Sequence, residues 1–495
     1  MPAEKLYPYS KFVGLDAIAD RRQMGERFLE ICEHAFVDLR GQINKLPGHK
    51  IKSGITAGAN IAYCEHYGKD VVLYGQKSTG GGSSIVLIQH PVGTSVDTTW
   101  GWGSAIDWCQ YLGKEYVFVD TGVPYSWDGS AWLAESTVFP AAIRGGCAAN
   151  VLARLAVSGY GPDYTEIAVS KAGAADFTVG SGAGDGARFD IRDDLTGKDR
   201  VRALGTFEGN KLAIFCGNET LLYVADPDIN NWALLRDFRV PIGTIGKRTV
   251  KRVGNDLFFA SRFGVHSLRR SVNGITLEAI TFSRVVQDLY FQCIKNMPPA
   301  IGQIEPRAVW DPNKGHYHLM IPQIGGSGPA AGPDGIYWAR FTFTIEPAGR
   351  QPHLSWGFTP SAGWADGTYF DGDMSIAVPT LGLCDDDMRY ETDTSRMRTR
   401  TAVLYQGSPQ REKTYKRLMV RASGDAKFRI RAYNQDLDVL DDDLLANYPD
   451  DDGSLLTPER PLDLPFEHRA YGVQIEFVSE DKGDLRIMDF AIVAE

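Results

Sequence analysis

The stretch Gly254-Asn-Asp-Leu-Phe-Phe-Ala260, followed by Arg262-Phe-Gly264 and Val265-His-Ser-Leu268, decides the fold class of this sequence. It consists of a glycine, two polar residues, an apolar run, a turn and a second apolar run. Short apolar runs that are bounded by glycine-containing turns are typical of paired β-strands. The stretch therefore predicts a β-hairpin.

The same pattern recurs along the middle of the chain. Good copies span residues 113–127 and 209–224, and weaker copies begin at Gly68 and Gly315. The starts at 68 and 113, and those at 209 and 254, lie 45 residues apart, which matches the roughly 40–50 residues of a four-stranded propeller blade. Further candidate starts lie at 150 and 367. We therefore predict a β-propeller over residues 51–388 with about six blades, five or seven remaining open.

The flanking regions show different patterns. Between residues 20 and 45, seven apolar residues recur at intervals of three and four, which predicts a helix within an N-terminal segment, 1–50. They are Met24, Phe28, Ile31, Cys32, Phe36, Leu39 and Ile43. From residue 389 the hairpin pattern disappears and alternating strands replace it, which predicts a C-terminal β-sandwich over 389–495. The expected fold class is all-β: a propeller with a C-terminal β-sandwich and an N-terminal helix.

Composition limits the possible functions. The formal net charge of -10 argues against a general nucleic-acid binder, which needs an excess of Lys and Arg on one face. An acidic channel that lets DNA slide past remains compatible with this charge. The 7 cysteines form no C-x-x-C pair and no zinc-type cluster, so no metal and no cofactor are expected. We expect a soluble protein, without a signal peptide or a membrane segment, that is made in the cytosol.

Catalytic motifs are not evident. The sequence contains no nucleophile elbow and no complete phosphate-binding loop, so we predict that the protein is not an enzyme and has no catalytic residues. Scattered Asp and Glu residues leave open a carbohydrate-active propeller enzyme, a glycosidase or lyase acting on surface polysaccharide, with its carboxylates at the axial mouth. A monomeric propeller that serves as a binding platform also remains open.

Rows of arginine are the most informative polar feature. Strand alternation in Arg396-Met-Arg-Thr-Arg400 places three guanidinium groups on one face, and Arg429 and Arg431 repeat this arrangement. A solvated sheet face is the simple interpretation. The alternative is a subunit interface in which these rows meet acidic loops of a neighbouring copy. The candidate interface residues are Arg396, Arg398, Arg400, Arg429, Arg431, Asp441, Asp442 and Asp443.

Four passages resemble the tail nozzle or tail hub proteins of short-tailed bacteriophages, which include the packaged-DNA stabilisation proteins. The passages are Leu46-Pro-Gly48, residues 152–177 with Leu152-Ala-Arg-Leu-Ala-Val-Ser-Gly159, residues 201–224, and residues 241–265 with Pro241-Ile-Gly-Thr-Ile-Gly246. The motif resemblance covers about residues 45–270, and the C-terminal region is similar in general layout.

The resemblance implies a structural virion protein. Similar proteins form a six-membered ring below the portal and adaptor, in which each subunit carries a propeller. A central channel holds back and then conducts the double-stranded DNA genome without sequence-specific binding. We therefore expect a homohexameric ring in the virion tail that is assembled in the host cytoplasm, contacts portal, adaptor and other tail proteins, and does not contact a membrane.

Overall fold

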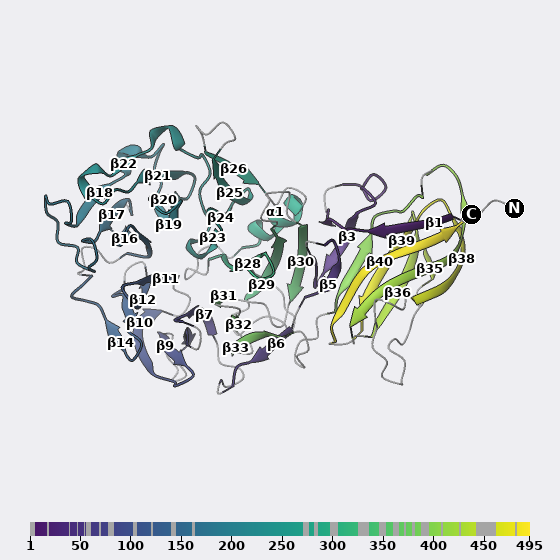
Figure 1. Ribbon diagram of the computed structural model, residues 1–495, viewed down its shortest axis with the longest axis horizontal. Coiled ribbons are helices and arrows are strands. Elements are labelled where there is room, and N and C mark those ends of the chain that lie inside the picture. Colours follow the sequence, from purple (N-terminus) through teal and green to yellow (C-terminus); the bar gives the residue numbers. More distant parts are fainter. Residues whose placement is uncertain are drawn as a thin grey trace.

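A computed structural model shows that the chain is built almost entirely of β-strands (Figure 1). Among the described residues, one α-helix occurs, α1 (Gln287–Lys295). No described helix is long and apolar enough to cross a bilayer. The structure describes all residues except 1–4, 17–18, 39, 47, 54, 56–60, 69–70, 78–83, 102–105, 120–121, 140–144, 161–163, 271–276, 282–285, 298–304, 325–335, 346–352, 360–365, 371–372, 379–381, 388–395, 407–408, 425–426, 442–461 and 481–482.

Seven groups of four antiparallel strands, counted over the described residues, form a ring. The first three groups are β7 (Ile61–His66), β8 (Val72–Lys77), β9 (Ser84–His90) and β10 (Ser95–Gly101); β11 (Ile106–Tyr111), β12 (Lys114–Val119), β13 (Tyr125–Trp127) and β14 (Trp132–Ala134); and β15 (Cys147–Val151), β16 (Arg154–Tyr160), β17 (Glu166–Val169) and β18 (Ala187–Asp190). The next two are β19 (Val201–Phe207), β20 (Lys211–Cys216), β21 (Thr220–Val224) and β22 (Ala233–Leu234), and β23 (Lys251–Val253), β24 (Asp256–Ser261), β25 (Gly264–Arg270) and β26 (Leu277–Thr281). The last two are β27 (Arg307–Asp311), β28 (His316–Ile324), β29 (Ile336–Thr344) and β30 (His353–Thr359), and β31 (Asp366–Phe370), β32 (Asp373–Val378) and β33 (Gly382–Asp387) with β6 (Gly48–Ile51).

These seven sheets are the blades of a β-propeller. The first strand of each blade lies toward the centre of the ring, as Figure 1 shows for β7, β11, β19 and β23. Neighbouring first strands contact one another: β11 contacts β15, and β15 contacts β19. Strand β27 contacts β31, and β31 contacts β7 of the first blade. The predicted propeller is confirmed. The estimate of six blades was one too low, because residues 366–387 form a separate blade.

The recurring glycines mark the turn between the first and second strand of a blade. Gly113, Gly209 and Gly254 have φ angles of 75°, 80° and 61°. A side chain is disfavoured in this left-handed region, and two-residue hairpin turns require it. In the third blade, Leu152 and Ala153 occupy the equivalent turn with φ angles of 47° and 55°. The copy that begins at residue 150 therefore lacks the glycine.

Apolar clusters between neighbouring blades hold the ring together. One cluster joins the first and second blades around Leu73, Trp108 and Val117, and another joins the fourth and fifth around Phe215 and Phe259. All of these residues are buried. A twisted four-stranded sheet cannot bury both of its faces alone, and radial stacking against two neighbours buries both.

The last blade takes its outer strand from the beginning of the chain. Antiparallel pairing joins β6 to β33, with Ile51 opposite Cys384 and Gly48 opposite Asp387. The other three strands of this blade come from residues 366–387. Backbone hydrogen bonds between the two ends of the propeller sequence therefore close the ring.

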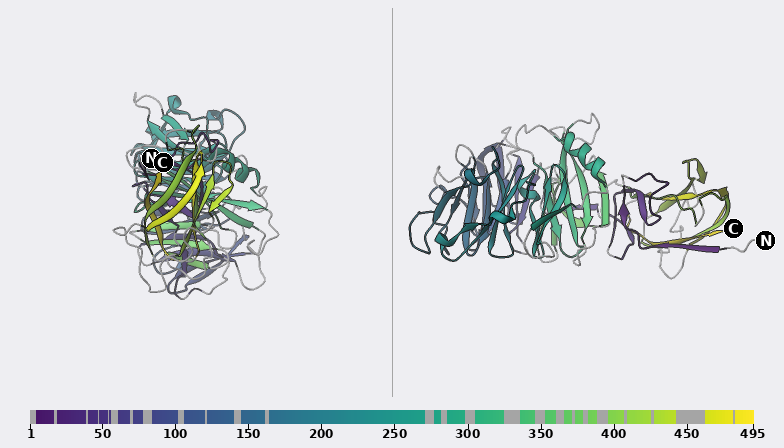
Figure 2. Two further views of the ribbon diagram at one scale, coloured as in Figure 1. Left: turned by 90° about the vertical axis from the view of Figure 1, so that its right-hand side faces the viewer. Right: turned by 90° about the horizontal axis from the view of Figure 1, so that it is seen from above.

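A second unit lies beside the propeller (Figures 1 and 2). One of its sheets runs in the order β38 (Leu462–Ala470), β35 (Lys413–Gly424), β40 (Leu485–Ala494), β5 (Ile43–Lys45) and β4 (Ala35–Val37), and β1 (Lys5–Ser10) also pairs with β40. The other contains β2 (Gly14–Leu15), β3 (Phe28–Glu33), β34 (Arg398–Thr401), β39 (Val473–Ser479), β36 (Phe428–Asn434) and β37 (Val439–Asp441). Residues of both sheets, among them Leu418 and Ile475, belong to one buried cluster.

The helix predicted between residues 20 and 45 is wrong, because this region forms turns and the strands β3, β4 and β5. A bulge between Leu29 and Ile31 shifts the register of β3 against β34. As a result, Leu29 and Cys32 are both buried although they lie three residues apart. The predicted helical spacing combines apolar residues of three separate strands: Phe28, Ile31 and Cys32 of β3, Phe36 of β4 and Ile43 of β5.

The propeller and the second unit share a continuous sheet. Strand β30 of the sixth blade pairs in parallel with β2, where Gly14 lies opposite Leu354, and with β3, where Glu33 lies opposite Trp356. Ten strands therefore form one sheet from β27 to β37. Backbone hydrogen bonds, and not a linker alone, connect the two parts.

Candidate functional site

The arginine rows lie on one face of the second unit, as strand alternation predicts. Met397, Thr399 and Thr401 are buried, whereas Arg398 and Arg400 point to the opposite face. On β36, the buried residues Phe428, Ile430 and Ala432 alternate with Arg429 and Arg431, which are partly exposed. Arg396, which precedes β34, is exposed.

Strand β39 separates the two rows and supplies their shared partner, Glu476. This residue lies opposite Arg400 on one side and Arg431 on the other. Its side chain is 0% exposed. Oε1 of Glu476 lies 2.8 Å from Nε of Arg398 and 3.9 Å from a guanidinium nitrogen of Arg400, and Oε2 lies 3.5 Å from Arg431. Three of the predicted interface arginines therefore converge on one carboxylate of their own chain.

Further contacts extend this group, which we call the Glu476 cluster: Glu476, Arg398, Arg400, Arg431 and Tyr433. The Tyr433 hydroxyl donates a hydrogen bond of 2.9 Å to Oε2 of Glu476, and the Arg400 guanidinium lies 5.3 Å from the centre of the Tyr433 ring. Burial, followed by the bond to Glu476, raises the pKa of Tyr433. The cluster ties β34, β39 and β36 together across their polar face.

The remaining predicted residues are placed less centrally. Arg429 pairs with Glu480 at 2.8 Å. Asp441 lies at the end of β37, with its Oδ2 3.8 Å from Nε2 of His468. Asp442 and Asp443 lie outside the described residues. The predicted contact between the arginine rows and the acidic loop of another copy stays a prediction.

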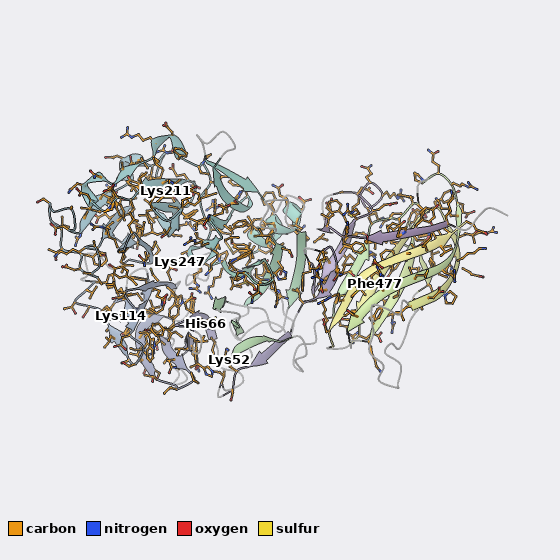
Figure 3. The ribbon with its side chains drawn as sticks, viewed as in Figure 1. Lys52, His66, Lys114, Lys211, Lys247 and Phe477 are labelled. Atoms are coloured by element: carbon orange, nitrogen blue, oxygen red, sulfur yellow. The ribbon has the colours of Figure 1, made fainter. Side chains whose placement is uncertain are left out.

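A second group of charged residues lies at the axis of the propeller, and we call Glu65, Asp107, Glu115, Lys247 and Arg248 the axial cluster. Lys247 and Arg248 belong to a 3-10 turn, Lys247–Thr249, and are 6% and 3% exposed. Figure 3 places Lys247 near the middle of the ring.

The two cations reach across the ring to other blades. Nζ of Lys247 donates a hydrogen bond of 2.7 Å to the carbonyl oxygen of Gly146. A guanidinium nitrogen of Arg248 donates to the carbonyl oxygen of Cys64 at 3.1 Å and lies 3.2 Å from Oε2 of Glu65. The turn therefore joins the fifth blade to the first and to the beginning of the third.

Burial controls the ionisation of the axial carboxylates. Burial raises the pKa of Asp107. The charges of Lys247 and Arg248 and two backbone N–H groups counteract this increase. The pKa of Glu115 lies well above its usual value because of burial and the nearby charge of Glu65, and Arg248 counteracts this effect. Buried carboxylates with raised pKa values next to cations occur in catalytic sites and in structural ion-pair networks alike.

No group of three or more metal-ligating side chains occurs among the described residues. His316 and His318 do lie side by side on β28, with ring centres 5.3 Å apart. Nδ1 of His318 is 2.9 Å from Oγ1 of Thr342. The imidazoles are thus part of the packed sheet.

Sequence reasoning placed the arginines but missed Glu476 and the axial cluster. The alternation of Val473, Ile475 and Phe477 would have placed Glu476 on the arginine face. The axial residues come from positions 65 to 248 and share no local pattern, so only the folded ring brings them together.

No protein-family model matches this chain, and no curated protein matches it. A chain of the mitotic checkpoint complex resembles it with a TM-score of 0.37 and 11% identity over 70% of this chain and 96% of that chain. BamB from Moraxella catarrhalis resembles it with a TM-score of 0.34 and 11% identity, over 72% of this chain and 92% of that chain. The β-propeller domain of Cps50 (Swd1) from Myceliophteria thermophila has a TM-score of 0.37 and 8% identity, over 68% of this chain and 97% of that chain.

Proposed function

We propose that this protein is a structural subunit of a phage tail, which assembles into a nozzle or hub ring and retains and then conducts the DNA genome through a central channel. The sequence resemblance over about residues 45–270 suggests this role. In this proposal the partners are further copies of the chain, in a hexameric ring, with portal, adaptor and other tail proteins. The location is the virion.

The observation that best supports a structural role is the filled axis of the propeller. Lys247 and Arg248 are buried there and bond to carbonyl oxygens of other blades. Side chains fixed in this way stabilise a scaffold, because breaking a buried ion pair is strongly unfavourable. A DNA channel would consequently lie between subunits and not along the axis of one propeller.

The connection between the two units also supports this role. The ten-stranded sheet that includes β30 and β3 joins the propeller to the second unit by backbone pairing, which would limit bending between them. A ring that holds pressurised DNA needs subunits of fixed shape. We further infer that the two sheets of the second unit form the predicted β-sandwich, with the exposed Arg396 and the acidic segment 441–443 on its contact surface.

Electron microscopy of the purified protein tests the proposal. We expect rings of six copies with a central opening wide enough for a DNA duplex. Arg396→Glu should dissociate the rings, and adding Asp441→Arg should restore them if these two patches meet. Arg188→Glu, on the exposed surface of β18 in the propeller, is the matched control for a charge reversal. Monomers at high protein concentration would contradict the proposal.

The axial carboxylates favour one alternative, a carbohydrate-active propeller enzyme. Glu65, Asp107 and Glu115 lie around Arg248, as an axial active site would require. A glycosidase needs one protonated and one ionised carboxyl group, and the raised pKa of Glu115 suits the protonated one. Cleavage of bacterial polysaccharides by the protein, abolished by Glu65→Gln but not by Glu480→Gln, would establish this alternative.

A further inference from the structure

A hollow of about 590 Å³ lies between the third and fourth blades, at the loop that connects β18 to β19. Its volume falls in the range of small-ligand sites. The lining residues are Thr165, Arg192, Leu195, Gly197, Lys198, Asp199, Arg200 and Arg202.

Positive charge predominates in this hollow. Four of the lining side chains are cationic and one, Asp199, is anionic. Oδ1 of Asp199 accepts hydrogen bonds from the backbone N–H groups of Arg200 and Gly217 at 2.8 and 3.0 Å, and Oδ2 accepts one from Asn218 at 2.7 Å. Backbone donors thus already engage the single carboxylate. The excess of positive charge is unusual on a chain with a net charge of -10.

The cations of the hollow differ in their exposure and in their contacts. Nε of Arg202 is shielded from solvent and has no hydrogen-bond partner among the described residues. Arg200 is exposed and lies 5.8 Å from the centre of the Tyr164 ring, and Lys198 is exposed. Arg192 is partly engaged, at 3.3 Å from Asp190. An anionic ligand in the hollow can reach the exposed Lys198 and Arg200 and would pair with their charges.

The loop that carries these cations is fixed before any ligand arrives. Its N–H groups at Ile191 and Val201 donate to the carbonyl oxygens of Thr165 and Tyr164 at 3.2 and 3.0 Å. The N–H of Thr196 donates to Oε1 of Glu219 at 2.6 Å. Preorganised groups lose little conformational entropy on binding, which favours affinity.

An adjoining hollow of about 190 Å³ provides an internal comparison. Its cations, Lys198 and Arg239, are balanced by Asp199 and Glu219. Nε of Arg239 lies 3.3 Å from Oε2 of Glu219. Of these two hollows, only the larger one therefore has an excess of positive charge.

We propose that the larger hollow binds phosphate groups, with Lys198, Arg200 and Arg202 as their ligands. Guanidinium groups match the oxygens of phosphate with paired N–H donors, and Lys adds a point charge. The volume exceeds that of one phosphate, so the hollow has room for a ligand that carries several. This inference does not rest on the proposed phage-tail function.

Isothermal titration calorimetry of the full chain with inorganic tripolyphosphate tests the inference. We expect saturable binding that weakens as salt increases, because surface charges are screened. Arg202→Gln should weaken it at least tenfold. The double variant Lys198→Ala, Arg200→Ala should do the same, and it changes only exposed side chains that pose little risk to folding. Arg188→Ala, an exposed arginine on β18 that does not line the hollow, is the matched control.

Competition with a single-stranded oligonucleotide identifies the source of the phosphate. Displacement of tripolyphosphate by the oligonucleotide would assign the site to a nucleic-acid backbone, and retention would assign it to a free phosphorylated compound; both results support the inference. Binding that is undetectable at millimolar tripolyphosphate would overturn it. Equal binding by the wild type and by the double variant would overturn it as well.

Discussion

Glu476→Gln tests whether the arginine face is held together from within the chain. The substitution keeps the shape of the side chain and removes the charge that Arg398, Arg400 and Arg431 share. Two short hydrogen bonds, from Arg398 at 2.8 Å and Tyr433 at 2.9 Å, end on this carboxylate. Hydrogen bonds to charged groups contribute about 1.5–3 kcal/mol each. Because the Arg398 side chain is 39% exposed and its contribution is screened, we expect the second unit to lose about 2–4 kcal/mol in all.

The ten tryptophans allow the two units to be followed separately, because all of them lie between residues 100 and 364. Tryptophan fluorescence therefore reports on the propeller and, through Trp356, on its junction with β3, whereas amide hydrogen exchange in β36 and β39 reports on the second unit. Glu476→Gln should accelerate exchange in these strands and leave the fluorescence transition unchanged. The control Glu480→Gln removes one partly exposed ion pair, with Arg429, and should lower the stability of the second unit by less than about 1 kcal/mol. Unchanged exchange in Glu476→Gln would refute the reasoning.

Three further substitutions test the propeller, each by the midpoint of tryptophan fluorescence in denaturant. Burial lowers the pKa of His266 to about 4, so the native state resists protonation and loses stability as the pH falls below about 6.5; His266→Asn should shrink the difference between pH 7 and pH 5 by about 2 kcal/mol. Burial raises the pKa of Glu115, so the stability present at low pH is lost as the pH rises above 4.5. Glu115→Gln should therefore stabilise the propeller more at pH 8 than at pH 4, and equal effects at both pH values would contradict this. The fully buried Arg154 donates hydrogen bonds to four carbonyl oxygens at 2.6–3.0 Å. Arg154→Leu should therefore lower the free energy of unfolding by about 3–5 kcal/mol, whereas the control Arg188→Leu should leave it almost unchanged.

The propeller could be predicted because its strands and turns leave local signals. The apolar runs after Gly113, Gly209 and Gly254 coincide with β12, β20 and β24. The blade count was harder to predict. The turn at Leu152 and Ala153 lacks glycine, and the last blade borrows β6 from a segment more than 300 residues away in the sequence. Pairing between distant segments leaves no local pattern.

The N-terminal region and the candidate sites show where local reasoning fails. The apolar spacing that predicted a helix comes from three short strands, β3, β4 and β5, and spacing alone does not distinguish such strands from one helix. The arginine face followed correctly from alternation, because the face of each side chain depends only on strand geometry. Its partner within the same chain, Glu476, depends on which strand lies between β34 and β36. That information is tertiary.

The pairing of the first and last strands determines how the protein would respond to mechanical load. Strand β1 runs antiparallel to β40, with Lys5 opposite Ala494 and Ser10 opposite Asp489. The Lys5 end of β1 and the Ala494 end of β40 lie together, far from the propeller (Figure 1). A force that separates them would open this pair one hydrogen bond at a time, as a zipper opens, and would reach the blades only after the second unit had yielded. Optical-tweezer pulling from the two ends should therefore show a low-force event before the propeller unfolds.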